Sequence, residues 1–393
     1  MKKTCPICKG KEINSLFSSD VPVLQNRVYD SIIEAKESTK ASVNLTHCNT
    51  CNFTFNADFD DSIILYDEKY DNAVPSQIFT QYYKAICSYL YKKYGLENGI
   101  IYDIGCGKGT FLNIFCDLYP MVKAIGIDPS YEGDLNPRSN LTFIKDFFKT
   151  EHVTDRPSLI ISRHVFEHIE FPKEFLELIR NPIAAIKTIP VFIEVPDFGW
   201  IVKNKTFWDI CYEHCNYFSE RSIEFMFNNS WSTLNTITKG FGDQYLWVEG
   251  VFNGGESDSL DLEFPEIEKK EITNFIESIR FSEDQILRIV EDYKANDYKI
   301  MVWGMATKGV IFTNRIDKEN KIIDCCIDIN KEKQHKYSPL SAHFIQEPSI
   351  LKSVSESKCL IIVMNMNYLE EIKKEVSSFR TDTIFIDAHG IEV

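Results

Sequence analysis

Three glycines and an acid lie close together in the heptapeptide Asp-Ile-Gly-Cys-Gly-Lys-Gly at residues 103–109. The apolar run 100–104 that leads into the glycines predicts a buried strand, and the Thr-Phe-Leu that follows them opens a helical pattern. A strand, a glycine turn and a helix bring backbone N–H groups close to a bound ligand in α/β folds. The residues of this predicted ligand cradle are Asp103, Gly105, Cys106, Gly107 and Gly109.

A second acid, Asp128, ends the next apolar run, residues 122–127, and is followed by Pro129. A carboxylate at the tip of the second strand of such a unit suits the hydroxyls of a ribose. Dinucleotide-binding folds need the spacing G-x-G-x-x-G, whereas the spacing here is G-x-G-x-G. The alternative interpretation is that the glycines only tighten a turn and that Asp128 caps a helix.

Four cysteines near the start of the chain form two Cys-x-x-Cys pairs, Cys5 with Cys8 and Cys48 with Cys51. Four thiolates in two such turns match the tetrahedral, sulfur-rich coordination of Zn²⁺. A complete thiolate shell leaves no open position for chemistry, so the predicted Zn²⁺ is structural. Redox-active or free cysteines are the alternative, and His47 is a substitute ligand.

Two polar segments follow predicted strands, where their side chains would lie at the carboxyl edge of a sheet. In the first, residues 163–168, α-helical spacing would put His164 and His168 on one face, but no third metal ligand is near in the sequence. The alternative is that these groups line the ligand pocket or hydrogen-bond to loops. The second segment joins Tyr212, Glu213 and His214, and it predicts a general base, His214, supported by Glu213. A buried hydrogen-bonded cluster is the alternative for this segment.

The elements that must position these residues fall into three predicted parts: residues 1–65, a zinc-binding module; 66–255, an α/β core; and 256–393, a smaller Rossmann-like α/β domain. Apolar spacing predicts a helix from residue 79 to near Gly95, and composition predicts a linker at 253–265. Strands and helices should alternate up to residue 252. Further strands are predicted at 141–144, 159–162, 191–195, 300–303, 322–329, 359–364 and 383–387, and helices at 272–293 (one or two), 307–315 and 368–378.

Composition limits the classes of function. Asp and Glu number 58 against 43 Lys and Arg, a formal charge of −15 without a dense basic block, which argues against nucleic acid as a main partner. No apolar run approaches the roughly 18 residues that cross a bilayer, so no membrane partner is expected. We expect no signal peptide, because Met-Lys-Lys leads directly into Thr-Cys-Pro, and twelve cysteines then favour the reducing cytoplasm.

The heptapeptide resembles the first motif of class I S-adenosylmethionine (SAM)-dependent methyltransferases. With the cysteine pairs, Arg-His-x-x-Glu-His-Ile at 163–169, Ile-Glu-Val-Pro at 193–196 and the C-terminal Trp303-Gly304 with Asp328-Ile-Asn330, the chain resembles the three-domain sugar C-methyltransferases of deoxysugar biosynthesis. The resemblance implies an α/β fold with a class I methyltransferase Rossmann-like core, a small N-terminal zinc module and a C-terminal Rossmann-like domain that holds the substrate or its carrier.

The resemblance also implies roles for individual residues. Asp103 would lie at the amino-acid end of SAM, Asp128 on its ribose, and Asp146 with Phe147 at the adenine. His214 would remove a proton beside the ketone of a nucleotide-linked 4-keto sugar, and the enolate would take the methyl group. The other cofactor contacts that we expect are Pro129, Arg163 and His164, and the expected acceptor contacts are His168, Glu194, Lys308 and Tyr337.

One departure from the family concerns the tyrosine three residues before its base. This chain has Cys211 there, so Tyr212 is the nearest phenol. The product would enter a polysaccharide or another deoxysugar compound. The alternatives are O-methylation of a sugar or related hydroxyl, a catalytically silent zinc and Rossmann interaction protein, and an NAD-dependent oxidoreductase, which the absent G-x-G-x-x-G disfavours.

Overall fold

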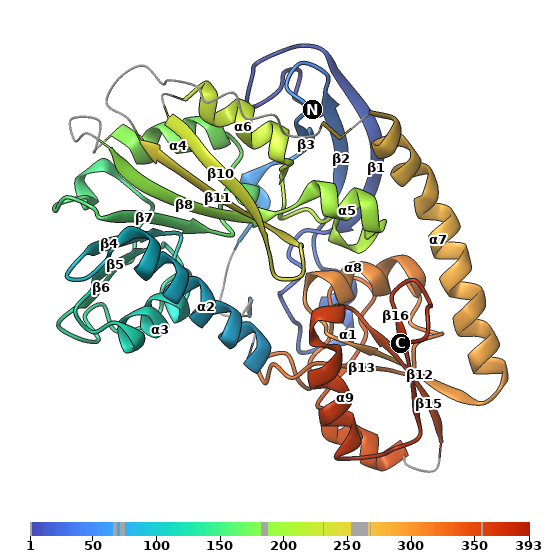
Figure 1. Cartoon of the computed structure of the whole chain (residues 1–393). Helices are drawn as coiled ribbons and strands as arrows, with labels where there is room; N and C mark the ends of the chain where they lie inside the picture. Colours follow the sequence, from blue (N-terminus) through green and yellow to red (C-terminus); the bar gives the residue numbers. More distant parts are fainter. Residues whose placement is uncertain are drawn as a thin grey trace.

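The computed structural model describes residues 2–65, 69–70, 75–181, 188–230, 232–252, 266–267, 269–354 and 357–393. These residues form three β-sheets with helices packed against them (Figure 1). The expected linker at 253–265 lies outside the described residues. Within the described residues, no helix has both the length and the apolar composition that crossing a bilayer requires.

The N-terminal sheet has the strand order β1-β2-β3-β9. Strands β1 (Ile13–Pro22) and β2 (Lys40–Cys48) form an antiparallel pair whose register runs from Ile13 opposite Cys48 to Pro22 opposite Lys40, and β2 pairs with β3 (Thr54–Asn56). The fourth strand, β9 (Asn216–Tyr217), comes from far along the chain and pairs with β3. The expected limit of the module at residue 65 is therefore not the limit of its sheet.

The central sheet has the order β10-β11-β8-β7-β4-β5-β6, in which β4 to β8 are parallel. Its chain order reverses at β4, and α/β folds bind ligands beyond the carboxyl ends of the strands at such a switch point. The predicted strands of this core are confirmed. The strands are β4 (Ile100–Ile104), β5 (Lys123–Ile127), β6 (Leu141–Ile144), β7 (Leu159–Arg163), β8 (Ile189–Pro196), β10 (Ser232–Gly240) and β11 (Tyr245–Phe252).

The expected alternation of strands and helices up to residue 252 is wrong at its end, because β10 and β11 form an antiparallel hairpin that pairs with β8. The predicted helix before the core is confirmed as α2 (Gln77–Tyr94), which Ser76 caps and Gly95 ends at φ 57°. The other helices and 3₁₀ turns of this part are α1 (Ile32–Lys36), η1 (Asp61–Ile63), α3 (Thr110–Leu118), η2 (Thr150–His152), η3 (Phe166–His168), α4 (Pro172–Arg180), α5 (Phe198–Asn204), η5 (Phe207–Asp209) and α6 (Glu220–Asn228).

The C-terminal sheet is parallel, with the order β14-β13-β12-β15-β16. The strand expected at 322–329 is shorter, because the N–H groups of Ile322 and Ile323 donate to the Asp317 carboxylate (2.9 and 2.8 Å). The expected helix or helix pair is one helix, α7. The elements are α7 (Lys269–Ala295), β12 (Tyr298–Trp303), α8 (Thr307–Ile316), β13 (Cys325–Ile327), β14 (Ile345–Gln346), η6 (Pro348–Val354), β15 (Lys358–Val363), η7 (Met366–Tyr368), α9 (Leu369–Ser377) and β16 (Thr383–Asp387).

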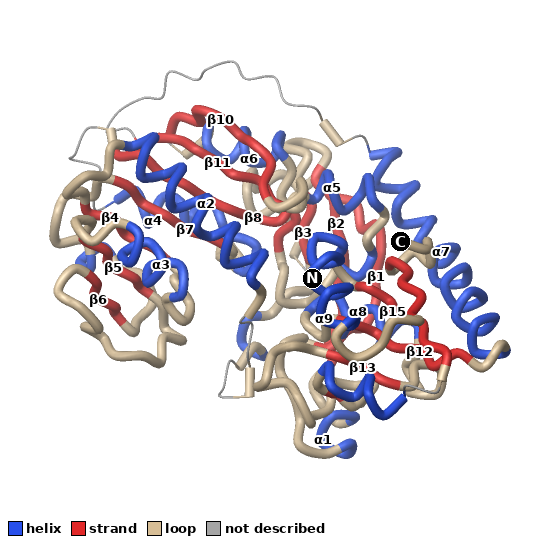
Figure 2. The backbone as a smooth tube through the Cα atoms, turned by 60° about the horizontal axis from the view of Figure 1, so that its bottom comes forward, coloured by secondary structure: helices blue, strands red, loops and turns tan. Residues whose placement is uncertain are grey.

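The C-terminal domain packs mainly against the N-terminal sheet and the α5–η5 segment, with which it shares one apolar cluster. In Figures 1 and 2 the strands β1 and β2 lie between the central sheet and α7. Polar contacts join the domain to the core: Glu371 of α9 accepts from Ser76 Oγ (2.6 Å) and Gln77 N (3.1 Å), and Asn367 donates to the carbonyl of Phe241 (2.7 Å). The carboxyl edge of the central sheet is thus bordered by the other two parts.

Candidate active site and metal centre

The loop after β4 has the backbone of a ligand cradle. Gly105, Gly107 and Gly109 all have positive φ, at 79°, 53° and 74°. A Cβ at Gly105 would lie 2.2 Å from Val165 Cγ2, so this turn packs tightly against the loop after β7. A Cβ at Gly107 would meet nothing within 4 Å, which leaves open space above the loop.

The two acids of the cradle differ in their surroundings. Asp103 is buried, and its Oδ1 has no hydrogen-bond partner among the described residues. Burial raises the pKa of Asp103 to about 7 against the opposing charge of Arg163. Asp128 accepts from the N–H groups of Gly107 (2.8 Å) and Ser130 (2.7 Å), so it also shapes the loop. An orphaned buried carboxylate oxygen at the base of a glycine cradle fits the ammonium group of an amino-acid ligand.

The expected adenine contacts lie at the end of β6. Asp146 is an ion-pair partner of Lys149 (2.5 Å), whose hydrogen bond lowers the pKa of that carboxyl. The Phe147 ring is 73% exposed, so it offers an unoccupied aromatic face for stacking. Pro129 directly follows Asp128.

Arg163 and Glu194 form a buried ion pair beneath the cradle. Arg163 Nε lies 2.8 Å from Glu194 Oε2, and the guanidinium lies over the rings of Tyr83 and Phe111 (4.4 Å each). Glu194 is fully buried and also accepts from Trp247 Nε1 (3.0 Å). The expected contact of Glu194 with an acceptor is therefore corrected, because its oxygens are already occupied inside the protein.

His164 joins this network. Its ring nitrogens lie 3.3 Å from Glu194 and 3.4 Å from Glu167, and its ring lies edge-on to Tyr245 (4.6 Å). Burial opposes protonation of His164, but the carboxylates of Glu194 and Glu167 outweigh it and raise its pKa to about 9. His164 has φ 55° and η3 is a 3₁₀ turn, so the expected α-helical face shared with His168 does not form.

His168 instead faces the second segment. Its Nδ1 lies 2.8 Å from the carbonyl oxygen of Glu213, so this nitrogen carries the proton. The rings of His168 and His214 meet edge to face at 4.9 Å. Single ligand atoms of Glu167, His168 and His214 all lie within 4.8 Å of one another, which defines the imidazole cluster of the site.

Asn216 connects the two segments that carry the imidazole cluster. Its amide donates to the carbonyls of Phe166 (2.8 Å) and Ile169 (2.6 Å), which fixes the chain after His214 along η3. Burial and the neighbouring His168 lower the pKa of His214 to about 3. The imidazole of His214 is therefore neutral at physiological pH.

The two residues beside His214 have other partners. The Glu213 carboxylate accepts from Gln25 N (2.9 Å) and Tyr70 Oη (2.7 Å), and burial raises its pKa; no described contact joins this carboxylate to the His214 ring. Glu213 reaches the cluster through its backbone carbonyl instead. The expectation for Tyr212 is corrected, because its hydroxyl accepts from Asp60 N (2.9 Å) and donates to Asp60 O (3.3 Å) in the N-terminal part.

The expected acceptor contacts of the C-terminal domain lie at two places. Lys308 of α8 binds both oxygens of Asp209 (2.6 and 2.7 Å), and its charge contributes to the lowered pKa of His214. Tyr337 pairs with the backbone of Tyr29 and packs on Phe344, in the contact between the N-terminal part and the C-terminal domain.

Sequence reasoning missed Gln25 and Tyr70 as partners of the site, and it included Glu167 only as a member of the polar segment 163–168. Gln25 and Tyr70 lie 188 and 143 residues from the glutamate that they contact, and no motif marks them. Buried Lys333 was also missed; it donates to Asn26 Oδ1 (2.7 Å) and links the C-terminal domain to the same N-terminal loop.

The four cysteines of the N-terminal part converge. The Sγ atoms of Cys5 and Cys51, and those of Cys8 and Cys48, are 3.5 Å apart, and all four lie within 4.8 Å of one another. Tetrahedral Zn²⁺ with bonds of about 2.3 Å spaces its sulfur ligands about 3.8 Å apart, so this donor set fits such an ion. His47 lies 3.0 Å from Thr54 Oγ1 and is not among the converging ligands.

Residues 78–230 match the family model of the methyltransferase domain, and residues 266–386 match that of the C-methyltransferase C-terminal domain. The chain therefore contains a methyltransferase domain. More particularly, it carries the C-terminal domain found in C-methyltransferases. No curated protein sequence matches the chain.

Several solved structures are similar to part of the chain. The plantazolicin methyltransferase BpumL in complex with SAH has 15% identity and a TM-score of 0.34, over 45% of this chain and 86% of BpumL. The magnesium protoporphyrin IX methyltransferase ChlM from Synechocystis PCC 6803 with bound SAH has 14% identity and a TM-score of 0.34, over 46% and 89%. The riboflavin-analogue dimethyltransferase RosA from Streptomyces davawensis has 15% identity and a TM-score of 0.36, over 44% of this chain and 54% of RosA.

We expect Gly107→Ala to weaken binding of S-adenosylhomocysteine at least about tenfold, because the methyl group would fill the open space of the cradle. Gly95→Ala is the matched control, since Gly95 also has a positive φ (57°) and free space but lies at the end of α2. Calorimetric titration of both variants measures the effect. Equal affinities of the two variants would show that the cofactor binds elsewhere.

We expect the His164 imidazole to stay protonated through neutral pH, with a pKa of about 9, and Glu194→Gln to lower that pKa. Its contribution to folding stability is fully present below the ordinary pKa of about 6.5 and is lost as pH rises through about 9. Nitrogen-detected NMR of the histidines follows the protonation. Urea unfolding between pH 6.5 and 9, with His164→Asn as the control, follows the stability. A neutral ring at pH 7 would contradict the buried charge network.

Proposed function

We propose that the chain methylates a carbon atom beside the ketone of a nucleotide-linked keto sugar. The observation that carries the proposal is the neutral imidazole of His214 in a cluster joined to the glycine cradle. Val165 packs on Gly105, and three residues later His168 contacts His214. The match of residues 266–386 to a C-methyltransferase domain supports carbon as the methylated atom.

In the proposed reaction the chain binds both reactants and moves one proton. Asp103 holds the ammonium group of the cofactor and Asp128 its ribose hydroxyls, with Phe147 against the adenine. His214 removes the proton from the carbon beside the ketone, and the developing enolate raises the proton affinity of the imidazole. SAM, when bound, supplies the electrophilic methyl group that the enolate attacks. Alignment of the two carbons supplies much of the acceleration.

Glu167, His168 and the Glu213 carbonyl orient the base. Because His168 Nδ1 donates to the Glu213 carbonyl, its Nε2 is the nitrogen available to the rest of the cluster. The Glu167 carboxylate is buried with one oxygen unpartnered among the described residues. Its negative charge is in place before the reaction and stabilises the positive charge that His214 gains with the proton.

The C-terminal domain is the proposed site of the nucleotide carrier. Its first β–α turn repeats the cradle geometry: Asp328 accepts from Met305 N (2.7 Å) and Asn330 N (2.8 Å), as Asp128 does from Gly107 and Ser130. Lys333 donates to the Met305 carbonyl in this turn (3.3 Å), and Lys308, which pairs with Asp209, lies in the first turn of the helix that follows. These groups suit a diphosphate, and Tyr337 lies in the adjoining contact. The product would then serve deoxysugar or polysaccharide biosynthesis.

We expect the protein to exchange the hydrogen beside the ketone of its acceptor for deuterium in D₂O without SAM, because His214 acts before methyl transfer. His214→Gln should abolish exchange and reduce methyl transfer at least about a hundredfold while it leaves S-adenosylhomocysteine affinity unchanged. His335→Asn, at an exposed position with positive φ, is the control that keeps both activities. Methyl transfer to a hydroxyl without carbon exchange would favour the O-methylation alternative.

The four cysteines are the proposed ligands of one structural Zn²⁺ per chain. All twelve cysteines are free of disulfides, which suits a cytosolic enzyme whose thiols stay reduced. We expect Cys51→Ser to lose the zinc and to lower stability, since bound metal contributes folding free energy. Elemental analysis and thermal unfolding measure both, and Cys325→Ser in the C-terminal domain is the control that keeps the metal. A full zinc content in Cys51→Ser would exclude this site.

A further inference from the structure

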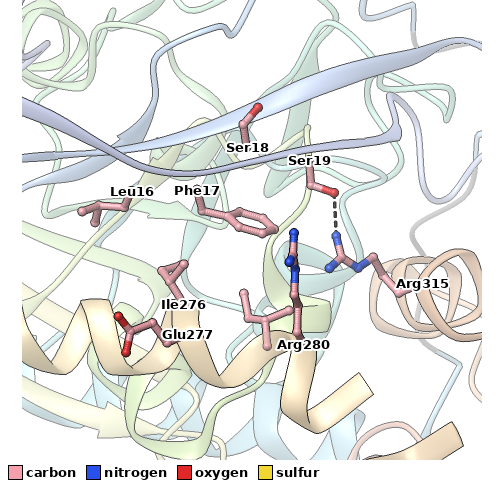
Figure 3. A pocket seen from close by; sticks show the side chains of 9 residues that line it. Leu16, Phe17, Ser18, Ser19, Ile276, Glu277, Arg280 and Arg315 are labelled. Carbon is pink, nitrogen blue, oxygen red and sulfur yellow. Dashed lines mark hydrogen bonds between the residues drawn. The ribbon is translucent and has the colours of Figure 1, made fainter. Parts of the chain in front are cut away.

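A cavity of about 520 Å³ lies outside the candidate active site, between the edge strand β1 and the helices α7 and α8 (Figure 3). Among the strands that the structure describes, β1 pairs only with β2, and its other edge faces this cavity. None of the described residues of the cradle or of the imidazole cluster lines it. The residues that matter here are Phe17, Ser19, Ile276, Glu277, Arg280 and Arg315.

The charges of this cavity are unequally compensated. Arg315 donates to Glu283 and to Ser19 Oγ (2.5 Å), and its guanidinium lies 5.6 Å from the Phe17 ring. Arg280 has no hydrogen bond or ion pair with any residue that the structure describes. In Figure 3 the guanidinium groups of Arg280 and Arg315 both point toward Ser19, whereas the Glu277 carboxylate points to the opposite end.

Glu283 compensates the charge of Arg315 but not that of Arg280, so an anion between the two guanidinium groups would be attracted to this end of the cavity. Each presents a planar fork of N–H donors that matches the oxygens of a phosphoryl group in pairs. The Phe17 ring and the Ile276 side chain supply apolar surface beside these donors. A cavity of this volume also has room for an organic group attached to the phosphate.

We propose that this cavity binds a phosphorylated small molecule, with the phosphoryl group between Arg280 and Arg315 and beside the Ser19 hydroxyl. Arg315 is already oriented by Glu283 and Ser19, so binding has to order only the side chain of Arg280. The site is separate from the proposed acceptor site and does not rest on the proposed reaction.

The cavity lies close to the segment that precedes the proposed base. A narrow space of about 10 Å³ adjoins the cavity, shares Phe17, Ser19 and Arg315 with it, and reaches Phe207 and Ile210. These two residues lie seven and four positions before His214 in the chain. A ligand that joins β1, α7 and α8 therefore also supports the packing behind the proposed base.

The test is calorimetric titration of the full chain with inorganic pyrophosphate. We expect saturable binding, and Arg280→Gln should weaken it at least about tenfold, because the lost guanidinium makes charge-assisted hydrogen bonds. Arg288→Gln is the matched control, since Arg288 is an exposed arginine of the same helix that does not line the cavity. Arg280 has no partner among the described residues, so its substitution leaves the fold intact.

Hydrogen exchange locates the bound probe. We expect pyrophosphate to slow exchange in residues 13–22 and in the first half of α7, and to do so less in Arg280→Gln. Pyrophosphate bound at the proposed acceptor site would instead protect the turn after β12 and would be insensitive to Arg280→Gln. That result, or the absence of saturable binding to the unaltered chain, would overturn the inference.

Discussion

The candidate site depends on a balanced set of buried charges beneath the carboxyl edge of the central sheet. Two carboxylates, Glu194 and Glu167, face two cations, Arg163 and the partly buried His164, and both carboxylates and Arg163 lie inside the protein. Removing one member of a buried pair leaves an uncompensated charge and typically costs about 3–5 kcal/mol. The loops after β7 and β8 are therefore held in one arrangement by electrostatics as well as by packing.

This balance also sets the electrostatic state of the imidazole cluster. The positive charge of His164 is already matched by carboxylates, so no further proton is held on His214, which burial keeps neutral. Arg163 of this network also acts on Asp103. Its positive charge keeps the pKa of the Asp103 carboxyl below the value that burial alone would give. One network of charged groups therefore links the cradle to the imidazole cluster, although the two are separate motifs in the sequence.

The sequence predicts most of this fold because its signals are local. Apolar runs mark β4 to β8, apolar spacing and a glycine mark α2, and the glycine spacing marks the cradle. The hairpin β10–β11 was missed because its strands lie where α/β alternation was expected, although the Gly242-Asp243 turn between them is a hairpin signal. Strand β13 is shorter than its apolar run because a single carboxylate, Asp317, captures the preceding N–H groups.

The site was predicted less completely, for a related reason. Residue type identified the histidines, but partners were assigned by sequence proximity, and proximity failed for Glu213 and Tyr212. Their side chains reach Gln25 and Asp60 in the N-terminal part and Tyr70 shortly after it. Long-range pairings of this kind depend on how the three sheets meet, and no local pattern records that.

The strand β9 has a consequence for how this protein can vary. It begins two residues after His214 and completes a sheet whose other strands come from the cysteine-bearing part. The segment with the proposed base therefore belongs to the N-terminal sheet, whose other strands contribute no reacting group. A recombined protein that takes this N-terminal part from a distant relative would have to take the 211–217 segment from the same source, so we expect the two to be inherited as one block.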